Sequence, residues 1–135
     1  MPHRTIVTRL KATAAVTALV PAVHIRPLRQ IQNVTLPAIT YEVTDYQTDD
    51  GINQAGSTVL AELSVICWAD TYDEAWDVAE EVRTALHYYR EGNDAGELMQ
   101  CRCTAMADAP ELPDDGSETA IHAVTQTYSL DYRKA

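Results

Sequence analysis

The sequence has no phenylalanine, only five glycines and three cysteines, and few basic side chains. The glycines are dispersed along the chain, which excludes a glycine-rich loop for phosphate binding. No apolar run approaches the roughly 20 residues that a membrane-spanning helix needs. An odd number of cysteines, two of them separated by one residue, favours free thiols in a reducing compartment over a disulfide framework.

The shortage of positive charge is the strongest signal in the composition. The 20 Asp and Glu outnumber the 10 Lys and Arg and give a net charge of -10. Affinity for nucleic acid comes mainly from basic side chains that displace counterions, so binding to a duplex or to a membrane surface is disfavoured. An acidic surface that lets DNA slide past without adhering is compatible with this charge.

The remaining composition is that of a globular protein. With 135 residues, 46% of them hydrophobic and 22% charged, the chain is expected to form one domain over residues 1–135. Two tryptophans and seven tyrosines without phenylalanine suit a protein rich in partly exposed edges and interfaces.

The most informative stretch runs from Leu60 to Leu86. Its first part alternates and predicts a half-buried strand whose apolar face carries Ala61, Leu63, Val65 and Cys67. Thr71 and Glu74 have the spacing of a capping box at a helix start. The apolar positions that follow step by three and four, which predicts an amphipathic helix with the stripe Tyr72, Ala75, Trp76, Ala79, Val82, Leu86 and Tyr89.

The other segments complete an α+β pattern. A helix is predicted over Pro2–Val20, and threonines within 12–23 argue against a signal peptide there. The further predicted pieces are a short extended segment at 23–26, strands at 37–46, 98–106 and 120–132, and mobile loops at about 47–57 and 108–118. Alternation places Met99, Cys101, Cys103 and Ala105 on one face of the strand at 98–106, and Val124, Tyr128, Leu130 and Tyr132 on the buried side of the last strand. This order predicts a mostly antiparallel sheet of four to five strands with two helices packed on one face.

Side chains that could carry chemistry have simpler interpretations. Cys67, Cys101, Cys103 and His122 could supply metal ligands, but strand alternation places the cysteines on the core face, where they act as small hydrophobes. His122 is expected on the outer side of its strand and His87 on the polar side of its helix. The helix acids Asp73, Glu74, Asp77, Glu80 and Glu81 have the spacing of a solvated face. No catalytic, cofactor-binding or metal-binding residue is predicted, and an enzyme is the weaker hypothesis.

Several segments in order resemble a known family. They are the opening helix at 5–20, Pro37-Ala38-Ile39-Thr40-Tyr41, Val65-Ile66-Cys67-Trp68, Thr71-Tyr72-Asp73-Glu74-Ala75, Val82-Arg83-Thr84-Ala85-Leu86 and Ser129-Leu130-Asp131-Tyr132-Arg133. With them the chain resembles the small tail-completion proteins of long-tailed bacteriophages, the tail terminator or tail-to-head joining group. The acidic segment from Asp108 to Glu118 is longer than that pattern leads us to expect.

The resemblance implies a structural virion protein that needs no cofactor. Such a subunit is expected to form a homohexameric ring on the last ring of the tail tube, where it ends tube growth and joins the tail to neck or head-completion proteins. DNA would pass through the lumen without specific binding, and no membrane is involved. The expected location is the tail or neck of a virion assembled in the host cytoplasm.

Residues 47–57 are the expected contact with the tube or a neighbouring subunit, because a long polar hairpin has no other evident purpose. The candidate interface residues are Asp49, Asp50, Ile52, Asn53 and Gln54. Two alternatives stay open: another neck component such as a head-completion (connector) protein, and a small cytoplasmic enzyme or ligand-binding α+β domain. The role of the three thiols is not determined by the sequence.

Overall fold

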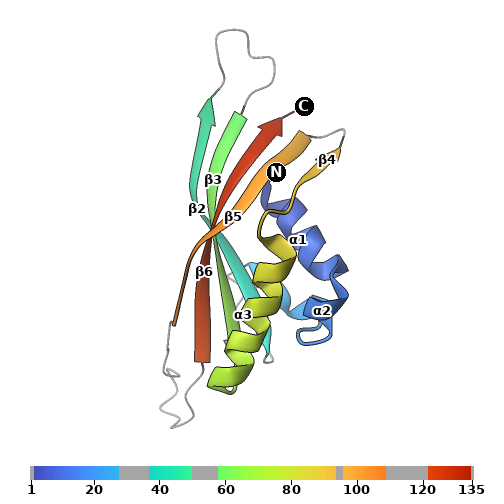
Figure 1. The fold of residues 1–135 in the computed structure, drawn as a ribbon, viewed down its shortest axis with the longest axis vertical. Helices are drawn as coiled ribbons and strands as arrows, with labels where there is room; N and C mark the ends of the chain where they lie inside the picture. Colours follow the sequence, from blue (N-terminus) through green and yellow to red (C-terminus); the bar gives the residue numbers. More distant parts are fainter. Residues whose placement is uncertain (1, 28–36, 50–57, 94–95, 109–121, 135) are drawn as a thin grey trace.

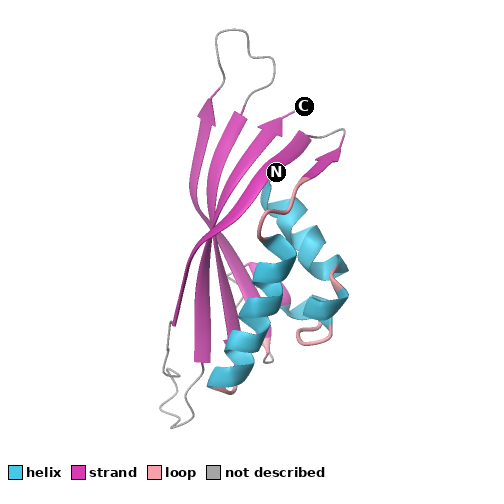
Figure 2. Ribbon diagram, in the orientation of Figure 1, coloured by secondary structure: helices cyan, strands magenta, loops and turns pink. Residues whose placement is uncertain are grey.

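The computed structural model describes residues 2–27, 37–49, 58–93, 96–108 and 122–134. In chain order the elements are α1 (Pro2–Ala12), α2 (Ala14–Thr17), a 3-10 turn (Ala22–His24), β1 (Ile25–Pro27), β2 (Ala38–Asp49), β3 (Thr58–Ala69), α3 (Tyr72–Leu86), β4 (Glu91–Asn93), β5 (Gly96–Asp108) and β6 (His122–Lys134). They form two layers, a long twisted sheet and a layer of helices on one of its faces (Figures 1 and 2).

Within the described residues the sheet has six strands in the order β1-β2-β3-β6-β5-β4. Only the β1–β2 pair is parallel, and every other neighbouring pair is antiparallel. The predicted α+β fold with a mostly antiparallel sheet is therefore confirmed. The three-residue strand β4 is an addition, since its glycine-containing sequence looks like a turn, and it pairs only with the start of β5.

Helix α3 begins as its sequence predicts. The backbone N–H of Glu74 donates a hydrogen bond to Oγ1 of Thr71 at 3.2 Å, which satisfies one of the free donors at the helix start. The buried side chains of α3 are Ala75, Val78, Ala79, Val82, Ala85 and Leu86. The predicted stripe is wrong at its first position, because Tyr72 lies in the first turn and is 50% exposed.

The N-terminal helix is interrupted, where the sequence predicts one continuous helix. Thr13 has an extended backbone (φ -86°, ψ 111°) between α1 and α2, and its hydroxyl donates to the carbonyl of Arg9 at 2.6 Å. A threonine side chain that bonds the preceding turn offers the backbone an alternative to continuing the helix. Apolar contacts with the core continue on both sides of the break through Ile6, Leu10, Val16 and Val20.

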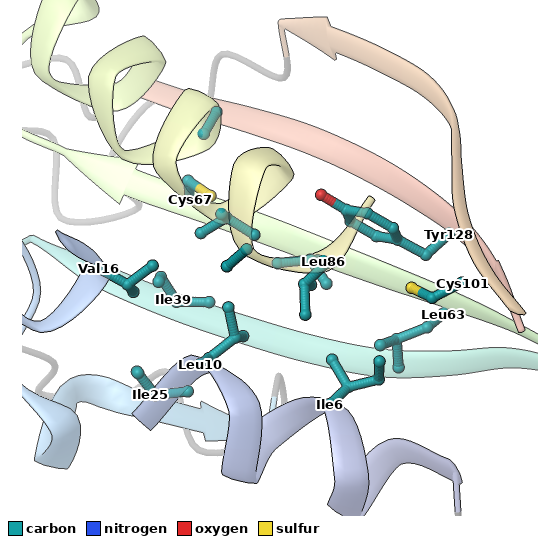
Figure 3. Packing of buried hydrophobic residues seen from close by; sticks show 14 of the residues in the cluster. Ile6, Leu10, Val16, Ile25, Ile39, Leu63, Cys67, Leu86, Cys101 and Tyr128 are labelled. Carbon is teal, nitrogen blue, oxygen red and sulfur yellow. The ribbon is translucent and has the colours of Figure 1, made fainter. Parts of the chain in front are cut away.

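The hydrophobic core lies between the helices and the sheet. Figure 3 shows Ile6, Leu10 and Val16 from the N-terminal helices facing residues of the sheet, with Leu86 of α3 between them. The predicted inward residues of the last strand are confirmed, since Val124, Tyr128, Leu130 and Tyr132 are all buried. Burial of this apolar surface is the main driving force for folding.

Bulges change the faces that simple alternation predicts. Register shifts lie between Val43 and Asp45 in β2, and between Leu98 and Gln100 and between Cys103 and Ala105 in β5. Cys101 and Cys103 are on the core face as predicted, but Ala105 lies on the opposite face, because the extra residue reverses the alternation. The side chain of Met99, predicted on the core face, lies outside the described residues.

The boundaries of the two predicted loops also change. Residues 47–49 belong to β2 and Asp108 ends β5, so both strands are longer than the sequence predicts. Residues 50–57 and 109–118 lie outside the described residues.

Candidate assembly surface

One edge of the sheet is formed by residues 42–49 of β2. The short strand β1 pairs with residues 39–41 of β2 and with nothing beyond them. No strand in the described part of the chain pairs with the outer edge of residues 42–49. The side chains at 42–47 are all exposed, and Val43 and Tyr46 are 38% and 41% exposed.

The other edge is the end of β5. Its first residues are covered, because β4 pairs with residues 96–98, the N–H of Tyr88 donates to the carbonyl of Cys101 at 2.6 Å, and the N–H of Cys103 donates to Nδ1 of His87 at 3.1 Å. From Thr104 to Asp108 no second strand lies beside β5 among the described residues. An uncovered strand edge presents backbone donors and acceptors to any partner that can pair with them.

A threonine stands at the bulge of each open edge. The hydroxyl of Thr44 donates to the carbonyl of Glu62, and that of Thr104 to the carbonyl of Thr127, both at 3.2 Å. Each bond ties the bulge to the neighbouring strand. Bulges increase the local right-handed twist, and the strands cross over one another at this level in Figure 1.

The end of β5 is tied to the start of α3 by a carboxylate. Asp108 accepts hydrogen bonds from Nε1 of Trp76 at 2.8 Å and from the hydroxyl of Tyr72 at 3.2 Å. The ring of His122 stands edge-on to that of Tyr72, with centroids 6.1 Å apart. His122 therefore lies on the helix-covered face, the same face as the buried Val124 two residues further along β6. The prediction that placed it on the outer face is wrong.

The helix layer is held together by Arg9. Its Nε donates to the carbonyl of Ala85 at 3.2 Å, and its guanidinium lies 4.6 Å from the centre of the Tyr89 ring. A cation over an aromatic face is attracted by the ring quadrupole. The contact joins α1 to the end of α3 and fixes both helices over the sheet.

Two of the three cysteines, Cys67 and Cys101, are buried, where a thiol has little reactivity. Burial raises the pKa of the Cys101 thiol to about 12 and that of Cys67 further still. Among the described residues no group of three or more His, Cys, Asp or Glu side chains is placed to hold a metal ion. His87 accepts its hydrogen bond from the backbone of β5, a positioning contact that the sequence did not reveal.

The predicted interface residues fall at the end of the first open edge. Asp49 is the last residue of β2 and pairs in register with Thr58 of β3. Asp50, Ile52, Asn53 and Gln54 lie outside the described residues. The sequence pattern of a single strand does not reveal the two strand edges, because which strand lies at an edge depends on the order of the whole sheet.

A sheet covered by helices on one face and open at two edges defines a small α+β subunit suited to assembly with other protein chains. The sequence matches the family described as tail completion protein gp17 over residues 4–128. The chain belongs to this family, and it is accordingly a structural protein of the phage virion tail; the family is not one of enzymes.

A solved structure supports the same fold. A chain described as "Virion of native gene transfer agent (GTA) particle" superposes with a TM-score of 0.68 and is 13% identical in sequence. The match covers 95% of this chain and 91% of that chain. No curated protein matches the sequence. None of the helices in the described residues is long and apolar enough to cross a membrane.

Proposed function

We propose that this protein caps the phage tail tube as a homohexameric ring, ends tube polymerisation and joins the tail to the neck or head. The observation that carries the proposal is the match to a tail completion family over residues 4–128, which spans nearly the whole described fold. A protein that completes a tail has to meet the tube on one side and the head-proximal components on the other.

The architecture supports a ring subunit. Two open edges on one sheet allow each copy to contact two neighbours through different surfaces, and such head-to-tail contacts close into rings when the rotation permits. The net charge of -10 suits a channel for DNA, since an acidic wall repels phosphates and lets the genome pass without adhering.

We further propose that the segment joining β2 to β3 contacts the tube or a neighbouring subunit. Asp49 stands at its start, and Asp50, Ile52, Asn53 and Gln54 follow it in the sequence. These side chains are polar apart from Ile52, a composition that serves a contact made on assembly.

A head-completion protein on the portal side of the neck is the second candidate, because it also needs an open-edged subunit around a DNA channel. A ligand-binding domain or enzyme is the third, and the family assignment counts against it.

Electron microscopy of particles made by the source phage with this gene disrupted tests the proposal. We expect filled heads beside unattached, overlong tubes, because tube growth is then not halted. Tails of normal length that fail to join heads would instead assign the protein to the neck. Normal particles would refute a role in the virion.

A further inference from the structure

The two open edges of the sheet lie at different heights along the strands. Through the registers with β3 and β6, Val43 of β2 is level with Cys103 of β5. The open part of β2 continues from this level in one direction, over residues 42–49. The open part of β5 continues in the other direction, over residues 104–108. In the register of the sheet the two edges are therefore diagonally opposed across the four long strands.

The direction of the strands suits contact between two copies. Because β2, β3, β6 and β5 alternate in direction, β2 and β5 of one subunit run antiparallel to each other. When a second copy is placed beside the first by rotation about an axis, β5 of one meets β2 of the next in antiparallel orientation. Antiparallel pairs are the commoner arrangement, and they continue the alternation of the sheet without interruption.

The diagonal placement sets the tilt of the strands in a closed assembly. To bring residues 42–47 beside residues 104–108, the next copy shifts by about four residues along the strands, roughly 13 Å at ~3.3 Å per residue. Four strands about 4.8 Å apart are roughly 19 Å wide. The ratio of the shift to the width corresponds to a tilt of the strands of about 35° from the ring axis, close to the roughly 35–45° of closed barrels.

The exposed charges on the outer face disfavour contact between two β2 edges. Glu42 and Asp45 are exposed beside the open edge of β2. With a shift of about four residues, Asp45 stands level with Ala107 of the next copy and Gln47 with Ala105, and both alanines are exposed with small side chains. The acidic pair therefore meets uncharged residues at a β2–β5 junction, whereas it would meet a second acidic pair if two β2 edges paired.

The helix-covered face offers apolar surface at the same junction. Val43 and Tyr46 project from β2 on this face and remain 38% and 41% exposed in the single subunit. Met106 lies on the same face of β5 at the other edge, half-buried against the core. Packing of these side chains against one another would remove apolar surface from water in each junction.

We propose that the occupant of each open edge is a second copy of this chain: residues 42–47 of β2 pair with residues 104–108 of β5 in the next copy. The inference rests on the ring of the proposed function and supplies its subunit contact. Asp45 of one copy stands level with Ala107 of the next, and Val43 and Tyr46 pack against Met106. The sheets of successive copies form one continuous sheet around the ring.

Disulfide trapping tests this contact in assembled particles and in the purified protein. Mixed subunits carrying either Asp45→Cys or Ala107→Cys are expected to form covalent dimers on mild oxidation. The matched control mixes Asp45→Cys with Ser129→Cys, an exposed position on β6 in the middle of the same face. We expect at least about tenfold more dimer in the first mixture, because pairing gives the two thiols a high effective concentration.

An introduced charge provides the second variant. Ala107→Glu sets a carboxylate against Asp45 of the next copy and is expected to weaken association by about tenfold per junction, and its combination with Asp45→Lys is expected to restore association. Arg83→Glu on the exposed face of α3 is the control and leaves association unchanged. Circular dichroism verifies that each variant is folded.

Native mass distinguishes failure of the strand contact from failure of the ring. Rings that assemble but give no disulfide between positions 45 and 107, or no response to Ala107→Glu, would overturn the strand contact and leave the proposed ring intact. Subunits that stay monomeric both in solution and in the particle would overturn the ring and with it this contact.

Discussion

The residues that fix the core most specifically are polar. Gln126 is fully buried on the helix-covered face of β6, where its Nε2 donates to the carbonyl of Ala79 at 2.7 Å and its Oε1 accepts from the hydroxyl of Tyr128 at 2.9 Å. The chain of bonds links the sheet to the middle of α3. A buried polar group that lacks such partners would strongly destabilise the fold.

Replacement of this glutamine tests the network. Gln126→Leu is expected to lower the free energy of unfolding by about 1–3 kcal/mol, because the hydroxyl of Tyr128 is left buried without its partner. Denaturant unfolding provides the measurement. The double variant Gln126→Leu/Tyr128→Phe removes both polar groups and should recover part of the loss; an equal or larger loss in the double variant would contradict this account.

The buried thiols make stability depend on alkaline pH. The pKa of Cys101 is raised from its ordinary value of 9.0 to about 12, first by burial and second by the neighbouring Cys103. In the unfolded chain the thiol loses its proton near pH 9, whereas the folded chain retains it. Stability contributed by the neutral thiol is thus present below about pH 9 and is lost between about pH 9 and 12, since the unfolded state then binds fewer protons.

We expect the free energy of unfolding to fall as the pH rises from about 8.5 to 10.5, with Cys101 contributing up to about 1.4 kcal/mol per pH unit. Equilibrium unfolding under reducing conditions measures the slope. The variant Cys101→Ala should be less stable at pH 7 but should lose less with rising pH. Identical slopes in the two proteins would exclude this thiol as a source of the dependence.

At the scale of elements, local signals specify α3 and tertiary contacts specify its ends. The cap at Thr71 is readable in the sequence, and the helix starts there. At the other end the chain passes through Tyr88 in the left-handed region (φ 63°), and His87 contacts the backbone of β5. A left-handed tyrosine is unusual, and the adjoining bonds to β5 hold it there.

Thr71→Ala is expected to destabilise the protein by about 1 kcal/mol, because the N–H of Glu74 loses its acceptor. Thermal or denaturant unfolding measures the change. Thr71→Ser keeps an acceptor at the same position and serves as the control. Equal losses in both variants would show that the methyl group, and not the hydroxyl, stabilises this turn.

The strands show which side-chain faces can be predicted from the alternation within a single strand and which cannot. Alternation correctly placed the inward residues of β3 and β6, since both strands are regular and lie in the middle of the sheet. It was wrong for Ala105, since a bulge is set by the pairing of two strands and leaves no mark in one of them. The break at Thr13 likewise depends on the turn that its hydroxyl bonds.

On the scale of the whole molecule, different parts of the surface are expected to make different contacts. Helices cover one face of the sheet and the two open edges flank it (Figure 2). In the proposed ring the edges contact neighbours and the hairpin contacts the tube. These functions are separable, so they respond to different substitutions.

Combined replacement of Asp49, Asp50, Ile52, Asn53 and Gln54 by alanine tests the hairpin. We expect the variant subunit to fold and to keep its native mass, because Asp49 is the last residue of β2 and the other four residues follow it in the sequence, outside the described core. Complementation of the disrupted phage gene should then yield fewer joined particles, counted by electron microscopy. Full restoration of joined particles would remove this segment from the interface.

The sequence by itself determined the α+β class, the capped helix, the inward faces of the regular strands and the resemblance to tail-completion proteins. Each of these depends on neighbours along the chain or on short ordered motifs. Only the tertiary structure decided that β3 pairs with β6, that two bulged edges are left open, and that a carboxylate at Asp108 ties β5 to α3. These features join residues far apart in sequence, and their free energy comes from contacts that form only when the whole sheet is assembled.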